Sequence, residues 1–147
     1  YVSISCNHCR EPICVESCPT KAMHKNEAGI VSVDSEKCVG CSYCEWACPY
    51  SAPQFDPSKG VMTKCDFCQG ELEKGKQPGC VAACPTRALS FGDYDELIGL
   101  HGENALIAPL PPPEMTAPNL VILAPRQAKS LNTTRGLIQN PEEVKDA

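Results

Sequence analysis

The stretch Cys38-Val-Gly-Cys41-Ser-Tyr-Cys44-Glu-Trp-Ala-Cys48-Pro49 decides the fold of this chain. Three cysteines at intervals of three residues, followed by a fourth cysteine and a proline, match the run that binds a bacterial-type 4Fe-4S cluster. Thiolate sulfur is the ligand type that suits iron-sulfur chemistry. The first three sulfurs can converge on one face of a tight loop, whereas the fourth, Cys48, is expected to complete a neighbouring cluster. The stretch therefore predicts a second cluster close by.

The spacing disfavours three other uses of these cysteines. Disulfides are disfavoured because cysteines this close in sequence are usually too crowded to pair with one another. Structural zinc usually takes paired Cys-x-x-Cys units that lie far apart, whereas here three cysteines fall within seven residues. A c-type haem needs a histidine directly after Cys-x-x-Cys, but Arg10 follows Cys9 and Ser42 follows Cys41. Iron-sulfur clusters are the favoured interpretation.

The twelve cysteines fall into three groups, each ending in a Cys-Pro pair. The last part of each group repeats one unit of the form Cys-x-x-x-Cys-Pro, which indicates a supersecondary element used three times. The third group differs by an insertion of eleven residues between its second and third cysteines. The groups are Cys6, Cys9, Cys14 and Cys18; Cys38, Cys41, Cys44 and Cys48; and Cys65, Cys68, Cys80 and Cys84.

The composition indicates a small domain with little hydrocarbon core. The 147 residues include only one tryptophan, four tyrosines and three phenylalanines. We therefore expect the clusters to act as the core and the metal-free chain to be largely unstructured. A formal net charge of -5 without a basic run gives no electrostatic footprint for nucleic acid. No stretch approaches 18 uninterrupted apolar residues, so no direct membrane span is expected.

The fold class expected is α+β, a bacterial-type double-cluster ferredoxin-like unit of short helices and β-hairpins in the order βαββαβ. Ala22-Met-His-Lys25 and Ile30-Val-Ser-Val33 flank a turn at Gly29 and predict one hairpin. Tyr1-Val-Ser-Ile-Ser5 alternates like a strand already under way, which suggests that an amino-terminal segment is missing. The insertion at 69–79 predicts a short surface helix and loop that either touches a partner or has no role.

Seven of the fourteen prolines lie between Pro109 and Pro141, in a region without cysteine. Such a tail is either disordered or laid in extended form across another surface. We favour the second, because exposing a long apolar run to water is unfavourable. This run, long enough for one strand, is Asn119-Leu-Val-Ile-Leu-Ala124. The expected domains are a double 4Fe-4S unit at 1–60, the third cysteine motif as half of a second ferredoxin unit at 61–100, and an extended partner-binding tail at 101–147.

The cross-over rule of two-cluster ferredoxins predicts the ligand sets. The third group then lacks its counterpart in this chain. Either Cys84 closes that site itself, or the group holds a three-iron, labile or absent cluster, which we favour. Lys21 and Arg87 follow Cys-Pro-Thr turns and are expected either to favour a reduced cluster or to be merely solvated. The predicted ligands are Cys6, Cys9, Cys14 and Cys48 for one cluster; Cys38, Cys41, Cys44 and Cys18 for the second; Cys65, Cys68 and Cys80 for an incomplete third; and Cys84 for a cluster of the missing segment.

The chain resembles the iron-sulfur electron-transfer subunits of the dimethyl sulfoxide reductase family of molybdoenzymes. The likeness covers essentially the whole chain and is more specific than the cysteine spacing. It is carried by Ser5-Cys-Asn-His-Cys9, Ala22-Met-His-Lys25, Cys48-Pro-Tyr50, Ala52-Pro-Gln54, Met62-Thr-Lys-Cys65-Asp66, Asp95-Glu-Leu97, His101-Gly102, Ala108-Pro-Leu110, Pro118-Asn119 and Asn140-Pro141.

The resemblance implies four 4Fe-4S clusters in the full family pattern, of which two are complete here and a third is incomplete, because the amino-terminal cysteine motif is lacking. It also implies a non-catalytic subunit that relays electrons between a quinol-oxidising membrane anchor and a molybdopterin catalytic subunit of an anaerobic respiratory reductase. The expected location is peripheral on the bacterial cytoplasmic membrane, on an unspecified side; this chain carries no signal peptide. The alternatives are a stand-alone polyferredoxin and, less favoured, a zinc-stabilised interaction module.

Overall fold

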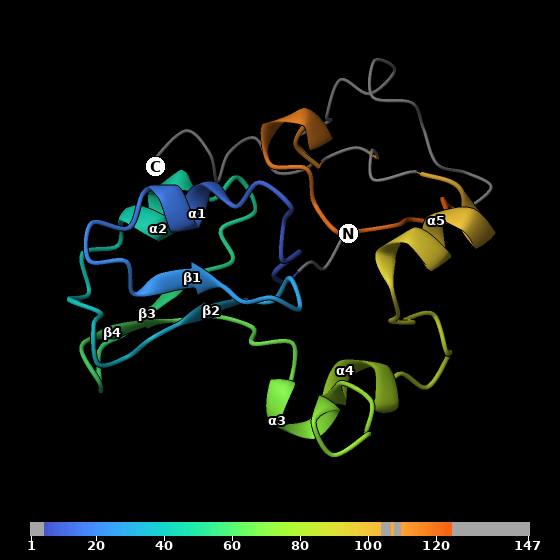
Figure 1. Cartoon of the computed structure of the whole chain (residues 1–147), viewed down its shortest axis with the longest axis horizontal. Helices are drawn as coiled ribbons and strands as arrows, with labels where there is room; N and C mark the ends of the chain where they lie inside the picture. Colours follow the sequence, from blue (N-terminus) through green and yellow to red (C-terminus); the bar gives the residue numbers. More distant parts are fainter. Residues whose placement is uncertain (1–4, 104–106, 108–109, 125–147) are drawn as a thin grey trace, which may run out of the picture.

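The computed structural model describes residues 5–103, 107 and 110–124. Two short helices, α1 (Ile13–Glu16) and α2 (Tyr43–Ala47), lie together over two antiparallel hairpins (Figure 1). The hairpins are β1 (Met23–Lys25) with β2 (Val31–Val33), and β3 (Gln54–Asp56) with β4 (Val61–Thr63). From α1 to β3 the order helix, strand, strand, helix, strand follows the expected unit. The expected first strand lies outside the described residues except for Ser5, which has no regular structure.

The first hairpin forms where the sequence predicts it. Met23 pairs with Val33 and Lys25 with Val31. The turn is closed by the Gly29 N–H, which donates to the Asn26 carbonyl at 3.0 Å, and Gly29 takes the left-handed backbone with φ of +80°. The second hairpin was not predicted, although Pro57 and Gly60 mark its turn.

Each Cys-x-x-x-Cys-Pro repeat forms the same short helix. Cys14 lies in α1, Cys44 in α2, and Cys80 in α4 (Gly79–Ala82). The helices stop before the cysteine that precedes proline, because proline disfavours helical backbone in the residue before it. Cys48 accordingly has an extended backbone, with φ of -76° and ψ of 115°.

The third cysteine group lies apart from the two hairpins, beside α3 (Gln69–Leu72) and α4 (Figure 1). The predicted surface helix in the insertion is confirmed by α3, which a loop follows. The chain continues into α5 (Tyr94–His101), where the Asp93 side chain caps the first turn by accepting from the Asp95 and Glu96 N–H groups. A 3₁₀ helix, Pro113–Met115, follows.

Part of the predicted tail lies within the described residues. Residues 119–124 have no regular secondary structure, and their extended course across another surface stays a prediction. Within the tail, residues 125–147 lie outside the described residues. What the structure does describe is a segment near Thr116 that packs on the first cysteine loop of the same chain.

The core between helices and hairpins contains cysteines among its apolar residues. Met23, Val31 and Met62 are almost fully buried, and Cys14 and Cys44 lie with them. The apolar cluster is small, as the composition predicts. The thiols of Cys14 and Cys44 are therefore part of the packed interior.

Candidate metal centre

Cys18 and the second cysteine loop line a single pocket between the helices and hairpins. Cys38, Cys41 and Cys44 contribute three thiols from the loop that the sequence singles out, and Cys18 comes from the end of the first group. The rest of the lining is mostly apolar and includes Met23, Val33, Val39 and Met62. Four thiols around one pocket are a donor set that fits a 4Fe-4S cluster. The structure thus brings together the four cysteines that the cross-over rule assigns to one site.

Backbone N–H groups point at the sulfurs of this pocket. The Met23 N–H donates to Cys18 Sγ at 3.4 Å, and the Met62 N–H donates to Cys38 Sγ at 3.3 Å. Although burial acts to raise the pKa of the Cys18 thiol, this N–H and the Thr20 hydroxyl lower it. Such donors favour the thiolate, which is the form that binds iron.

Burial makes the inner thiols costly to ionise without a cation. It raises the pKa of Cys44 to about 11, with a further contribution from the neighbouring Cys18 and Cys38. In the first group, burial followed by the nearby Cys6 and Cys48 raises the pKa of Cys14 to about 12. Thiolates in such surroundings need a compensating positive charge, which bound iron supplies.

The first cysteine group gathers around a site of its own, which we call the first centre; the pocket lined by Cys18, Cys38, Cys41 and Cys44 is the second centre. Cys6 and Cys48 act electrostatically on both Cys9 and Cys14, an effect that falls off with distance and so indicates that the four thiols are neighbours. Cys6 Sγ accepts from the His8 N–H at 3.4 Å. The second ligand set expected from the cross-over rule is therefore also close in space.

The third group is more exposed. Cys65 Sγ accepts from the Phe67 N–H and Cys68 Sγ from the Gly79 N–H, both at 3.4 Å, so the ends of the insertion are drawn together. Cys84 Sγ accepts from the Ala88 N–H at 3.3 Å. The Thr86 hydroxyl, followed by backbone N–H groups, lowers the pKa of Cys84 to about 7.

The same backbone device recurs in all three cysteine loops. His8, Gly40 and Phe67 each lie two residues after the first cysteine of their group, and their φ angles are +44°, +67° and +59°. This left-handed conformation turns the N–H of His8 and of Phe67 toward the preceding cysteine sulfur. Two of the three positions are not glycine, which is costly for the backbone and is typical of functional sites.

The His8 and Phe67 rings also join the first and third loops. Their centroids are 5.2 Å apart in an edge-to-face arrangement, and Phe67 contacts Phe91 in the same way at 6.4 Å. His8 Nδ1 accepts from the Val31 N–H at 3.0 Å. Burial, followed by the charge of Lys64, lowers the pKa of His8 to about 4.

One cation beside the cysteine groups, Lys64, is one that sequence reasoning missed. Lys64 Nζ donates to the carbonyl oxygens of Val31 and Cys65, and its charge lowers the pKa of Cys14. The two cations that the sequence suggested, Lys21 and Arg87, are both exposed. The sequence feature that could have indicated this role is that Lys64 directly precedes Cys65.

The geometry also bears on the alternative uses of the cysteines. All twelve lie within the described residues, and none forms a disulfide. Within those residues no three Cys, His, Asp or Glu side chains are close enough to hold a single metal ion. A 4Fe-4S cubane spreads its four ligands around a larger body than one zinc ion does. The individual ligand assignments stay predictions.

Comparison with known proteins places these features in context. Residues 1–94 match the model of a 4Fe-4S dicluster domain. The B subunit of anaerobic dimethyl sulfoxide reductase from Haemophilus influenzae is 54% identical, over 98% of this chain and 70% of the relative. The protein of the same name from Escherichia coli is 51% identical over the same shares. A thiosulfate reductase electron transfer subunit from Salmonella typhi is 47% identical, over 65% of this chain and 50% of the relative.

Proposed function

The chain belongs to the 4Fe-4S dicluster family and, within it, to the B subunits of anaerobic dimethyl sulfoxide reductases, and from this premise we propose that it relays electrons between a quinol-oxidising membrane anchor and a molybdopterin catalytic subunit. Its relatives are iron-sulfur electron-transfer subunits, so the chain itself is a non-catalytic subunit, as the sequence predicts.

The observation that carries the proposal is the pocket lined by Cys18 together with Cys38, Cys41 and Cys44. When bound there, a 4Fe-4S cluster supplies a one-electron redox centre. The chain's own residues hold the thiolates, exclude water with Met23, Val33 and Met62, and direct N–H groups at the sulfurs. Such hydrogen bonds and burial are the means by which a protein adjusts a cluster potential.

We assign two complete clusters to the chain. One uses Cys18, Cys38, Cys41 and Cys44, and the other uses Cys6, Cys9, Cys14 and Cys48. The electrostatic coupling within each set supports this division. Cys65, Cys68 and Cys80 provide an incomplete third site, and Cys84 is assigned to a cluster whose other ligands are not among the twelve cysteines of this chain.

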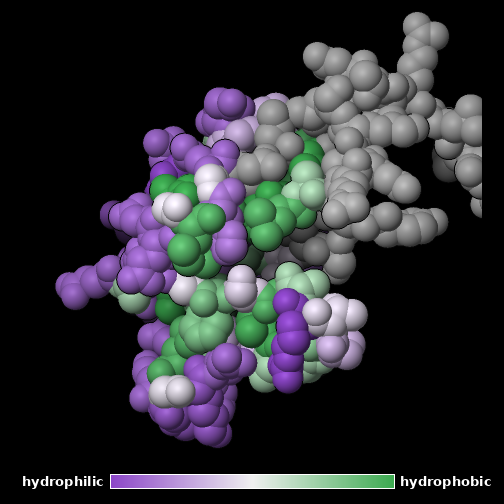
Figure 2. Space-filling model, turned by 90° about the vertical axis from the view of Figure 1, so that its right-hand side faces the viewer, coloured by the Kyte–Doolittle hydropathy of each residue, from purple (hydrophilic) through white to green (hydrophobic). Residues whose placement is uncertain are grey.

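Partner binding is supported by large apolar side chains that remain exposed. Trp46 is 76% and Val39 66% exposed, and Tyr43 packs against Trp46 with ring centroids 5.6 Å apart. Figure 2 shows apolar residues exposed in the middle of another face, with hydrophilic residues to the left of them and below. Exposed apolar patches of this kind mark interaction surfaces. No helix among the described residues is long and apolar enough to cross a membrane, and we propose a peripheral location within the complex.

The test of cluster binding is anaerobic purification of the chain, followed by assays of iron, acid-labile sulfide and the visible spectrum. We expect brown protein with equal amounts of iron and sulfide and a paramagnetic signal on reduction. Colourless protein containing stoichiometric zinc would contradict the proposal and support the zinc-stabilised module.

The test of the partners is affinity purification of the chain from anaerobically grown cells. We expect a large molybdenum-containing subunit to copurify with it. A chain that carries clusters but is recovered alone, under conditions where the complex of a relative survives, would instead support a stand-alone polyferredoxin.

A further inference from the structure

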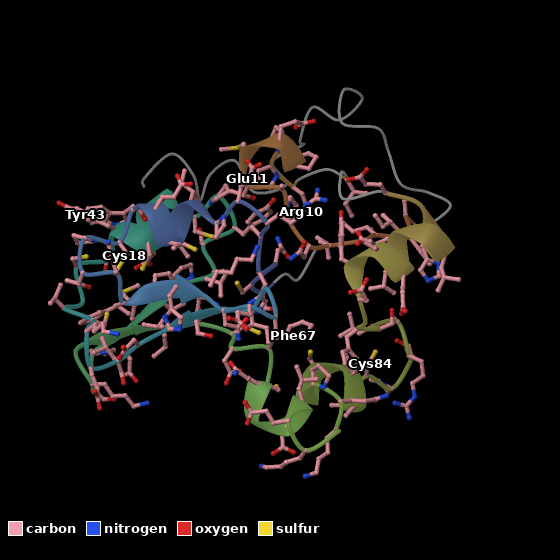
Figure 3. The ribbon with its side chains drawn as sticks, viewed as in Figure 1. Arg10, Glu11, Cys18, Tyr43, Phe67 and Cys84 are labelled. Carbon is pink, nitrogen blue, oxygen red and sulfur yellow. The ribbon has the colours of Figure 1, made fainter. Side chains whose placement is uncertain are left out.

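Residues 116–119, which we call the strap, lie on the first cysteine loop of the same chain. The Arg10 N–H donates to the Ala117 carbonyl at 2.8 Å, and the Glu11 N–H to the Thr116 carbonyl at 3.1 Å. Asn119 Nδ2 donates to the His8 carbonyl at 2.8 Å across 111 positions of sequence. Figure 3 shows Arg10 and Glu11 directly beside this downstream segment. The strap is therefore part of the wall of the first centre.

The backbone of the strap is bent so that Thr116 points inward. The 3₁₀ helix ends at Met115, and the Ala117 N–H donates back to the Pro113 carbonyl at 2.8 Å. Ala117 then takes the left-handed conformation with φ of +44°, which is costly for a residue with a Cβ atom. As a result Thr116 is only 1% exposed, although Met115 directly before it is exposed.

The buried Thr116 hydroxyl has no hydrogen-bond partner among the described residues. Two other buried side-chain atoms share this condition, Asn7 Nδ2 and His8 Nε2, and both belong to the loop that the strap covers. All three can donate a hydrogen bond; His8 Nε2 carries the proton because Nδ1 accepts from Val31. Burying a donor without an acceptor is unfavourable, so three around one loop indicate an acceptor at that place.

Two acceptors are available there, the Cys9 sulfur and the Tyr50 hydroxyl. The hydrogen bonds of the strap to Asn7, His8, Arg10 and Glu11 lie on both sides of Cys9 and so hold Thr116 against the loop at this cysteine. Burial raises the pKa of the Cys9 thiol and the Thr116 hydroxyl acts to lower it; Thr116 and Asn7 act in the same way on the Tyr50 hydroxyl. Thr20 and Thr86 already approach the sulfurs of Cys18 and Cys84 at 3.7 and 3.6 Å, so a threonine hydroxyl beside a cysteine recurs in this chain.

We propose that the Thr116 hydroxyl donates a hydrogen bond to sulfur at the Cys9 corner of the first centre, so that the strap closes this centre and stabilises its reduced form. The inference rests on the proposed function, because it requires a cluster held by Cys6, Cys9, Cys14 and Cys48. Thr116 is a positioning residue, and its effect is on the potential. Donors to cluster sulfur favour the more negative, reduced state and raise the reduction potential.

The test is a redox titration of the cluster-loaded full chain, followed by electron paramagnetic resonance. Thr116→Val removes the hydroxyl but keeps the shape, and Thr116→Ser restores the hydroxyl. We expect Thr116→Val to shift one cluster signal to a more negative midpoint potential and to leave the others unchanged. Thr116→Ser and the control Thr63→Val, on β4, should titrate like the unaltered chain.

Several outcomes would overturn the inference. One is an unshifted potential in Thr116→Val; another is an equal shift in Thr116→Ser. A matching shift in Tyr50→Phe would show that the hydroxyl serves the tyrosine instead. If Thr116→Val loses the first cluster, retention of full iron in Thr116→Ser supports the inference and loss in both contradicts it. Failure of the proposed function is distinct, since the unaltered chain would then show no cluster signal.

Discussion

At the residue scale, the left-handed residue two positions after the first cysteine of each group contacts different neighbours. At His8 and Phe67 this conformation places a ring between the first and third cysteine loops, and the two ring centroids are 5.2 Å apart. Gly40 uses it to let backbones approach, because a Cβ atom there would lie 2.6 Å from the Gly60 carbonyl oxygen and 2.9 Å from Phe55 Cε2. The second cysteine loop is therefore held against the second hairpin at a glycine.

We predict that Gly40→Ala destabilises the cluster-loaded chain by about 1–3 kcal/mol, from left-handed strain and the close approach to the Gly60 carbonyl. The measurement is the urea midpoint followed by circular dichroism, with iron content as a second readout. Gly60→Ala is the matched control, because Gly60 has nearly the same φ of +68° but open space around its Cβ position. Equal losses in the two variants would refute the steric part of the argument.

At the scale of elements, β4 links the second hairpin to the second centre. Met62 is 2% exposed, packs in the core with Met23 and Val31, and donates its N–H to Cys38 Sγ. The hairpin thus both fills the core and orients a ligand. This explains why a strand of three residues can matter to the site.

We predict that Met62→Ala costs about 2–5 kcal/mol of stability, the usual range for emptying a buried site. Met62→Leu, which nearly conserves volume, should cost less than about 1.5 kcal/mol. Leu100→Ala on α5 serves as the control, since Leu100 is 75% exposed. Chemical unfolding of the cluster-loaded variants measures the effect. A loss in Leu100→Ala as large as that in Met62→Ala would contradict the role given to the core.

At the scale of the whole molecule, the proposed ligand set of each of the two centres takes three thiols from one cysteine group and a fourth from the other. Cys18 lines the pocket of the second loop, and Cys48 acts electrostatically on the thiols of the first. In the proposed assignment the two centres bind the two halves of the unit together, because each half supplies one ligand to the other's cluster.

We predict that Cys18→Ala impairs the cluster of the second loop and spares that of the first, and that Cys48→Ala does the reverse. Spectra of the two variants on reduction, together with iron per chain, provide the comparison. Cys48→Ala is the matched partner of Cys18→Ala because both cysteines precede proline after a short helix. If Cys18→Ala empties the first centre instead, the cross-over assignment is wrong.

We also predict that removing iron with a chelator under anaerobic conditions unfolds most of the chain. The buried hydrophobic residues of the described part are few, and two of them are cysteines. Metal binding then contributes folding free energy directly. Circular dichroism should show loss of structure that returns when iron and sulfide are restored. A metal-free chain with an unchanged spectrum would contradict this expectation.

The sequence by itself determined the cysteine groups, the family, the first hairpin and the helix of the insertion. These features depend on spacing and turn chemistry within a few residues, such as Gly29 in its turn and each proline after its cysteine. Only the tertiary structure decided that the strap covers the first loop, that Lys64 reaches the Val31 carbonyl on β2, and that His8 meets Phe67. These contacts join residues far apart in sequence. They form because buried hydrogen-bond donors and rings need partners in the packed interior. A pattern within a few residues of sequence does not indicate which distant residue will be that partner.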